Sequence, residues 1–297
     1  MKRALLFTVL LASALALLAL PTGRALAQAA GPDVVYQAAN PATVASGDYT
    51  LLSLVIDFPP GSGFPEHTHP GPVVVTVLEG EITLRERGGE RKVGTGESWT
   101  ENVGDRHYVL NEGSTNCRIF ATLLVPKGAD PQTFVPGGQG ADLPAPKITY
   151  QVAQPATVVA GDYSVLNLVL DFKPQAGVPN HVHPGPVTVT ILSGQITQHD
   201  DTGDQVVVTG GTWAETANHM HSVINEGQTT TRMAAGLLVP KGAEPQTIVS
   251  GPPAGMPRTG AEAWKFADVA WATVVLALLF IAAGIVSRLG RRESKLR

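Results

Sequence analysis

The sequence predicts an all-β protein made of two tandem copies of one small barrel, with an apolar segment at each end of the chain. Three observations predict this. One block of sequence repeats at a fixed spacing, each copy consists of short β-branched runs separated by turns, and glycine (32) and proline (23) are abundant among 297 residues. With 43% hydrophobic and 15% charged residues, the composition excludes a disordered or collagen-like chain.

The N-terminal segment, 1–27, has the order of a secretory signal peptide. Lys2 and Arg3 precede an apolar stretch, 4–20, and a small-residue triplet follows it, so we expect cleavage after Ala27. The alternative is an uncleaved N-terminal anchor, because the apolar stretch is at the long end for a signal. Both interpretations predict that the protein is exported.

The C-terminal segment, 256–297, carries a second apolar run. Residues 269–286 contain no charge and are just long enough to cross a bilayer as a transmembrane helix, and a basic tail follows them. Because positive charge stays on the inner side, we expect the barrels to face outward from the cell membrane. A buried core helix would explain the apolar run equally well, but it would not explain the basic tail.

A short motif, MPRTG at 256–260, stands before this run. With the apolar span and the basic tail, it resembles the cell-wall sorting signal read by sortases, whose usual form is LPxTG, with Met256 in place of leucine. The resemblance implies cleavage between Thr259 and Gly260 and covalent attachment of the barrels to the wall, with a sortase as partner. The alternative is a plain membrane anchor preceded by a coincidental linker.

Charge and cysteine content narrow the function classes. The net charge is −4 although both termini are basic, so the region between them is more acidic than the whole chain, which argues against nucleic acid as a partner. Cys117 is the only cysteine, so no disulfide can form within the chain. Its counterpart in the second copy is Thr231, and we therefore interpret Cys117 as a buried strand residue.

An internal duplication dominates the chain. The run LLVPKGA at Leu123 recurs at Leu237, 114 residues later, and every other match has the same offset without a gap. A unit of this length is the size of one independent domain, so we expect each copy to have its own core. The predicted domains are 28–141 and 142–255, with a linker at 136–146.

Within each copy, short β-branched runs alternate with glycine-containing turns. Neither copy has the length or the period of a substantial helix. Six to eight strands at this spacing give a sandwich or a jelly-roll barrel. In the first copy the predicted strands are 51–58, 73–78, 81–85, 97–101, 108–110 and 119–125.

A set of three histidines occurs in the first copy and recurs in register in the second. Residues two apart on a strand point to the same face, so the histidines of each HxH pair can both enter the barrel and a third can join from a distant strand. Three neutral imidazoles leave open coordination positions, as in a reactive or substrate-binding divalent metal site. Ordinary surface or core histidines are the alternative, and retention in both copies favours metal. The two sets are His67, His69 and His107, and His181, His183 and His221.

These residues resemble the two motifs of the cupin family, and of bicupins in particular. The first motif, G(x)5HxH(x)3–4E(x)6G, is matched by the run GSGFPEHTHPGPVVVTVLEG from Gly61. The second, G(x)5PxG(x)2H(x)3N, is matched by Gly96, Gly104, His107 and Asn111, but Asn102, and Thr216 in the second copy, replace its proline. The resemblance spans residues 36–251. It implies two double-stranded β-helix (jelly-roll) barrels in which the histidines bind a divalent metal ion, namely Fe, Mn, Zn, Ni or Cu.

The chain departs from the family pattern at a ligand position. Where the family has its glutamate ligand, this chain has Val73 and Val187. Either the site has three histidines alone, or another carboxylate substitutes, and Glu101 and Glu215 are the candidates because they match each other across the duplication. The alternative for these two glutamates is a hydrogen bond to a ligand histidine.

Two further matched pairs have a structural and a functional interpretation. Asp57 and Asp171 close a strand before a proline-containing turn, so we expect them to cap the turn rather than to perform chemistry. Trp99 and Trp213 are expected in the barrel core, although either could form one wall of a small-molecule pocket.

Two function classes follow from these observations. The first is an extracytoplasmic metalloenzyme, a dioxygenase-like metal-dependent oxidoreductase or an isomerase-like catalyst, that takes a small oxygen-bearing substrate in the barrel mouths. The second is a non-catalytic module that binds a small molecule or a metal. No nucleophile–base pair, phosphate loop or dinucleotide fingerprint occurs outside the histidine sites.

Overall fold

The structure is a computed structural model that describes residues 30–251. This part of the chain is entirely β, as predicted, and no helix in it is long and apolar enough to span a membrane. The predicted signal peptide at 1–27 and the segment at 256–297, with its sorting motif and apolar run, lie outside the described residues.

Each repeat contributes ten strands in the same order. The first repeat has β1 (Asp33–Val44), β2 (Gly47–Phe58), β3 (Gly63–Thr68), β4 (Val73–Glu79), β5 (Glu81–Glu86), β6 (Gly89–Gly94), β7 (Ser98–Glu101), β8 (His107–Leu110), β9 (Cys117–Pro126) and β10 (Thr133–Phe134). The second has β11 (Lys147–Val158), β12 (Gly161–Phe172), β13 (Gly177–Val182), β14 (Val187–Ser193), β15 (Gln195–Asp200), β16 (Gly203–Val208), β17 (Thr212–Glu215), β18 (His221–Ile224), β19 (Thr231–Pro240) and β20 (Thr247–Ile248).

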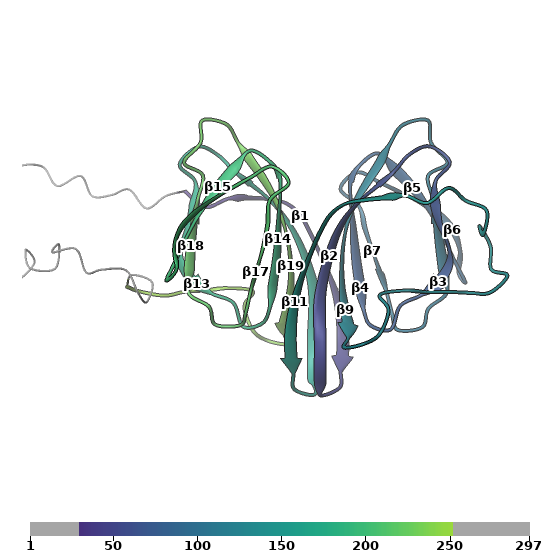
Figure 1. Ribbon diagram of the computed structural model, residues 1–297, viewed down its shortest axis with the longest axis horizontal. Helices are drawn as coiled ribbons and strands as arrows, with labels where there is room; N and C mark the ends of the chain where they lie inside the picture. The colour runs from purple at the N-terminus through teal and green to yellow at the C-terminus, as the bar shows by residue number, and fades with distance from the viewer. Residues whose placement is uncertain (1–29, 252–297) are drawn as a thin grey trace, which may run out of the picture.

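The strands form four antiparallel five-stranded sheets, two to a barrel, and the barrels stand side by side (Figure 1). In barrel 1 the inner sheet has the order β11-β2-β9-β4-β7 and the outer sheet β10-β3-β8-β5-β6. In barrel 2 the corresponding orders are β1-β12-β19-β14-β17 and β16-β15-β18-β13-β20. All six strands predicted in the first copy are present, and the structure adds β1, β3, β6 and β10.

The two repeats exchange their first strands. β1 pairs along its length with β12 in barrel 2, and β11 pairs with β2 in barrel 1. The expectation of a separate core for each copy is confirmed, but the copies are not independent units, because each barrel needs one strand from the other repeat. A sequence pattern predicts that a segment is extended. Because the two repeats are similar, they offer this segment two similar partner strands, and the pattern does not determine which of them it pairs with.

Apolar side chains are buried in three places. One core fills barrel 1 around Phe58, Ile82 and Trp99, and a matching core fills barrel 2 around Phe172 and Ile191. Two smaller clusters lie between the inner sheets, where residues from both repeats meet. The barrels are thus fixed to each other by apolar packing in addition to the exchanged strands.

Buried polar contacts hold the two inner sheets in register. The Ser53 hydroxyl lies 2.8 Å from that of Thr122 on the same sheet and 2.7 Å from that of Thr188 on the facing sheet. Gly236 stands opposite them, where a Cβ would lie 2.4 Å from the Ser53 and Thr122 hydroxyls. The sheets approach closely here because this position has no side chain.

Cys117 is buried in β9, as predicted.

The turn-capping role expected for Asp57 and Asp171 is wrong. Asp57 accepts hydrogen bonds from Nε and Nη2 of Arg118, at 2.7 and 2.9 Å, directly across the β2–β9 ladder. Asp171 makes the same contacts with Arg232. These aspartates therefore form cross-strand ion pairs and do not cap turns, since the ladder brings each one opposite an arginine 61 residues away in sequence.

Candidate metal centre

The three histidines of each repeat converge inside their barrel, as predicted. His67 lies on β3 directly opposite His107 on β8, and His69 follows the end of β3. The strands can approach because residue 63 is glycine, where a Cβ would lie only 2.3 Å from the Val109 carbonyl oxygen. One ligand atom from each of the three buried rings lies within 4.8 Å of the others. The equivalent set is His181, His183 and His221.

Backbone carbonyls fix the orientation of all three rings in barrel 1. The Nδ1 atoms of His67 and His69 lie 2.7 Å from the carbonyl oxygens of Pro65 and Pro131, and Nδ1 of His107 lies 3.2 Å from that of Asp105. A carbonyl only accepts, so Nδ1 is the protonated nitrogen of each neutral ring. The lone pair of Nε2 is then free for a cation, which is the usual arrangement of metal-binding histidines. The same carbonyl contacts recur in barrel 2 at Pro179, Pro245 and His219.

Glu101 is the fourth group at this centre. Its two carboxylate oxygens lie 3.0 Å from Nε2 of His69 and of His107. Trp99 donates its indole N–H to Oε1 at 2.7 Å, while Oε2 is buried and accepts no hydrogen bond. Glu215 in barrel 2 has the same relation to Trp213, at 2.6 Å, and its Oε2 is likewise without a donor.

This donor set fits a divalent metal ion. An Nε2 lone pair and a carboxylate oxygen are both acceptors, so two such atoms at 3.0 Å repel unless a proton or a metal ion lies between them. Nitrogen and carboxylate ligands together suit Fe, Mn, Zn, Ni or Cu, and three or four protein ligands leave positions open for a substrate.

The pKa shifts in barrel 1 favour a charged Glu101 carboxylate and a neutral His67, whereas they favour the charged form of His107. Burial and the neighbouring rings lower the pKa of His67 to about 4. Burial alone would raise the pKa of Glu101, but its contacts with His107 and His69 outweigh burial and bring that pKa below its usual value. The pKa of His107 is raised, because the contact with Glu101 outweighs the effect of burial.

Barrel 2 has the same residues with weaker contacts to the carboxylate. Glu215 lies 3.2 Å from Nε2 of His221 and 3.6 Å from Nε2 of His183, further than in barrel 1. Burial, with a smaller contribution from Asp200, therefore raises the pKa of Glu215 to about 7, and burial lowers that of His221 to about 3. The two centres share their ligands but differ in electrostatics.

An apolar chamber of about 240 Å³ opens onto the centre of barrel 1. Its walls include Leu54, Phe64 and Trp99, and all three histidines and Glu101 face into it. Trp99 is therefore both a core residue and a pocket wall, so the two interpretations offered by the sequence are compatible. The equivalent wall positions of barrel 2 remain apolar, with Val178 in place of Phe64.

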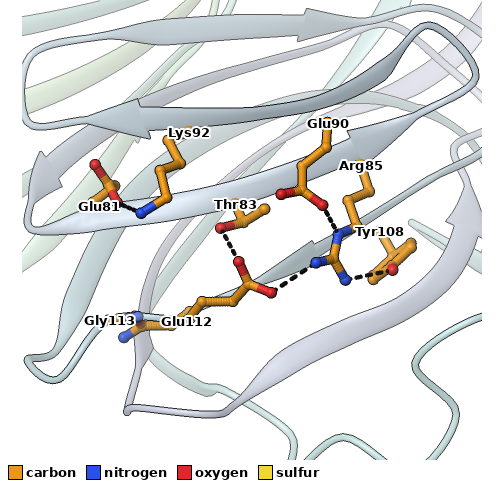
Figure 2. Close-up of polar contacts among 9 residues, drawn as sticks. Glu81, Thr83, Arg85, Glu90, Lys92, Tyr108, Glu112 and Gly113 are labelled. Atoms are coloured by element: carbon orange, nitrogen blue, oxygen red, sulfur yellow. Dashed lines mark hydrogen bonds and ion pairs between the residues drawn. The ribbon is translucent and has the colours of Figure 1, made fainter.

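A second, charged groove of about 890 Å³ reaches His107 and Glu101 from the side of the β5–β6 hairpin. Arg85 is held there by Glu90, by the Tyr108 hydroxyl at 2.7 Å and by Glu112 at 2.7 Å, and Thr83 donates to the other oxygen of Glu112 (Figure 2). In barrel 2 the positions of Arg85 and Tyr108 hold His199 and Ser222. The groove residues have thus diverged between the repeats, whereas the apolar character of the chamber-wall positions has been retained.

Comparisons with known proteins place both repeats in one family. The family model described as "Cupin domain" matches residues 54–125 and 168–239, so the chain carries two tandem cupin domains, the arrangement of a bicupin. Each match contains all three histidines of its repeat and its glutamate, Glu101 or Glu215. None of the curated proteins matches the chain.

Solved structures resemble the chain at low sequence identity. AerE from Microcystis aeruginosa is 11% identical with a TM-score of 0.47, over 69% of this chain and 98% of that one. An oxalate decarboxylase from Lactobacillus farciminis, in a formate complex, is 11% identical with a TM-score of 0.49, over 73% and 91%. A salicylate 1,2-dioxygenase from Pseudaminobacter salicylatoxidans is 12% identical with a TM-score of 0.42, over 63% and 70%.

Sequence reasoning missed some contributors to the site. Pro131 and Pro245 orient His69 and His183 through backbone carbonyls, which leave no residue-type signal beyond their recurrence in both copies. Ile148 and Gln151 line the chamber of barrel 1 although they belong to the second repeat. Their counterparts in the first repeat are Val34 and Gln37. The sequence alone did not show which barrel each pair of residues lines.

Proposed function

We propose that each barrel binds one divalent metal ion through its three histidines, with Glu101 or Glu215 as a fourth ligand, and that the protein is a metalloenzyme acting on a small molecule. One observation carries the proposal. In each barrel Nε2 of one histidine, His69 or His183, faces the buried Oε2 of Glu101 or Glu215, which has no hydrogen-bond donor, and a cation held by the three rings would satisfy that oxygen.

The surroundings of the centre favour catalysis over metal storage. The chamber gives a small molecule direct access to the ligand atoms, and its mostly apolar walls lower the local dielectric constant, which strengthens electrostatic interactions at the site. A divalent ion with open positions would supply Lewis-acid or dioxygen-binding chemistry, and dioxygenase-like oxidation with dioxygen as oxidant is the reaction class we propose. Trp99 would hold the Glu101 carboxylate in position during this reaction.

We also propose that the barrels are exported and attached to the cell membrane, with cell-wall attachment by a sortase as a second stage. The order of residues in the two terminal segments supports this part of the proposal. Protease digestion of intact cells would test it, because outward-facing barrels are degraded whereas an internal protein is protected.

Elemental analysis of the purified full chain tests metal binding. We expect two divalent ions per chain in the wild type, one in His107→Ala, one in His221→Ala and none in the double variant. His199→Ala is the matched control, since His199 lies outside both centres, and it should retain two. A folded wild type without metal would refute the proposal. Oxygen consumption with phenolic and thiol substrates then tests catalysis, and it must disappear in the double variant.

A further inference from the structure

The chamber of barrel 1 is completed by a strand from the second repeat. In barrel 1, β11 is the edge strand of the inner sheet, where Ile148 stands opposite Ile56 and Gln151 opposite Leu54. Directly opposite residues on paired strands share a face of the sheet, and Ile56 and Leu54 line the chamber. Ile148 and Gln151 therefore lie at the chamber as well, at its open edge.

The exchanged strand β1 has the same relation to barrel 2. Val34 stands opposite Leu170 and Gln37 opposite Leu168, on the inner sheet of that barrel. Val34 and Gln37 are the counterparts of Ile148 and Gln151, one repeat earlier in the chain. An aliphatic residue and a glutamine thus stand at the edge of both barrels, and each pair belongs to the other repeat.

Large apolar side chains are exposed near the metal centre of barrel 1 and at the matching positions of barrel 2. Ile148 is 49% exposed, and Phe134, opposite His67 on the neighbouring sheet, is 50% exposed. The corresponding residues of barrel 2 are Val34, at 59%, and Ile248, at 53% and opposite His181. Exposed apolar residues that gather around a cavity, and recur in a second copy, mark a binding site for an apolar ligand.

Size and charge restrict the ligand further. A volume of about 240 Å³ is roughly eight times the volume of a water molecule in the liquid, which leaves room for a ligand of roughly ten non-hydrogen atoms. A divalent ion with one carboxylate and three neutral imidazoles carries a net positive charge and favours an anionic oxygen. The glutamine at the edge offers a carboxamide to the far end of the ligand.

We propose that the exchanged strands are specificity elements, and that each chamber takes a small carboxylate or phenolate with an aromatic or branched aliphatic body. The anionic oxygen lies at the metal, and the body contacts Ile148 in barrel 1 or Val34 in barrel 2. A polar group at the far end hydrogen-bonds Gln151 or Gln37. This inference rests on the proposed metal centres.

Benzoate and 4-hydroxybenzoate are suitable probes, used with the metal-loaded full chain in calorimetric titrations. His221→Ala leaves only barrel 1 loaded. In that background we expect Ile148→Ala to weaken benzoate binding about five- to tenfold, because contact with an apolar side chain is lost. Val34→Ala, at the other barrel, is the matched control and should leave the affinity unchanged. In the reciprocal His107→Ala background the two substitutions should exchange their effects.

The glutamine is tested separately. Gln151→Ala should weaken 4-hydroxybenzoate several-fold and leave benzoate unaffected, because only the former has a para hydroxyl. A metal-loaded wild type that binds neither probe, or equal effects of Ile148→Ala and Val34→Ala on barrel 1, overturns this inference and leaves the metal centres standing. A wild type without metal overturns the proposed function, and the inference with it.

Discussion

Replacement of Trp99 by phenylalanine isolates the contribution of a single hydrogen bond to the metal centre of barrel 1. The change keeps an aromatic ring in the chamber wall and removes the indole N–H that lies 2.7 Å from Oε1 of Glu101. A hydrogen bond to a charged group contributes about 1.5–3 kcal/mol, and the loss of a group that orients a metal ligand lowers metal affinity roughly 10–100-fold. At about 1.4 kcal/mol per tenfold the two ranges agree, so we expect that loss of affinity in barrel 1.

The assay is a metal titration of the metal-free full chain in the His221→Ala background, where only barrel 1 binds. The matched control is Trp213→Phe in the same background, which removes the equivalent bond to Glu215 in the disabled barrel and should leave the affinity unchanged. Glu101→Gln is the comparison variant. If Trp99 acts through Glu101, the variant that combines Trp99→Phe with Glu101→Gln should bind metal no more weakly than Glu101→Gln alone.

Two outcomes would refute this reasoning. An unchanged affinity in Trp99→Phe would mean that the Glu101 carboxylate does not depend on the indole for its position. Additive effects of the two substitutions would mean that Trp99 acts on the metal by another route, such as packing around the histidines. Circular dichroism of each variant separates either outcome from unfolding.

Two further predictions concern stability and the exchanged strands. Asn40 on β1 donates to the carbonyls of Val73 and Glu101 in barrel 1, both at 2.9 Å, so Asn40→Ala should destabilise the protein by about 1–3 kcal/mol in urea unfolding and reduce metal occupancy in barrel 1 only. The equivalent position in β11 is the less buried Gln154, and Gln154→Ala should change the free energy of unfolding by less than about 0.5 kcal/mol. Equal losses of stability in Asn40→Ala and Gln154→Ala would contradict the role of Asn40. The hydrogen bonds from Arg118, with a smaller contribution from Thr149, lower the pKa of Asp57 from 3.8 to about 2. The ionised Asp57 therefore stabilises the fold above about pH 3.8, and this stabilisation is lost as the pH falls through about 2. Asp57→Asn should therefore cost about 1–2 kcal/mol in urea unfolding at pH 7 and less at pH 2, and a cost that does not change with pH would contradict the ion pair.

The fold was predictable where short-range patterns determine it. The β-branched runs, the turn glycines and the duplication predicted the strands, and the HxH spacing with its recurrence predicted the converging histidines. Glu101 could be proposed because it matches Glu215, although its distance from His69 and His107 required the structure. These features depend on residues close in sequence, or on comparison of one copy with the other.

Long-range pairing was not predictable. β1 and β11 are almost interchangeable in sequence, so no local signal determines whether β11 pairs with β2 or with β12. For the same reason Asp57 was assigned to a turn, because Arg118 becomes its neighbour only when β2 and β9 pair. Both errors concern partners chosen by the three-dimensional arrangement of two similar halves.

The exchange of β1 and β11 also bears on how such a chain can arise. A chain holding a single repeat would be left with one unpaired strand and one barrel lacking an edge, and two such chains could satisfy each other by trading those strands as a symmetric dimer. Fusing the two copies into one chain makes the strand exchange intramolecular, so that it no longer depends on the protein concentration as it does in a dimer. Once fused, the halves can accumulate different residues around their entrances, as Arg85 and His199 have done, which identical subunits of a symmetric dimer cannot do.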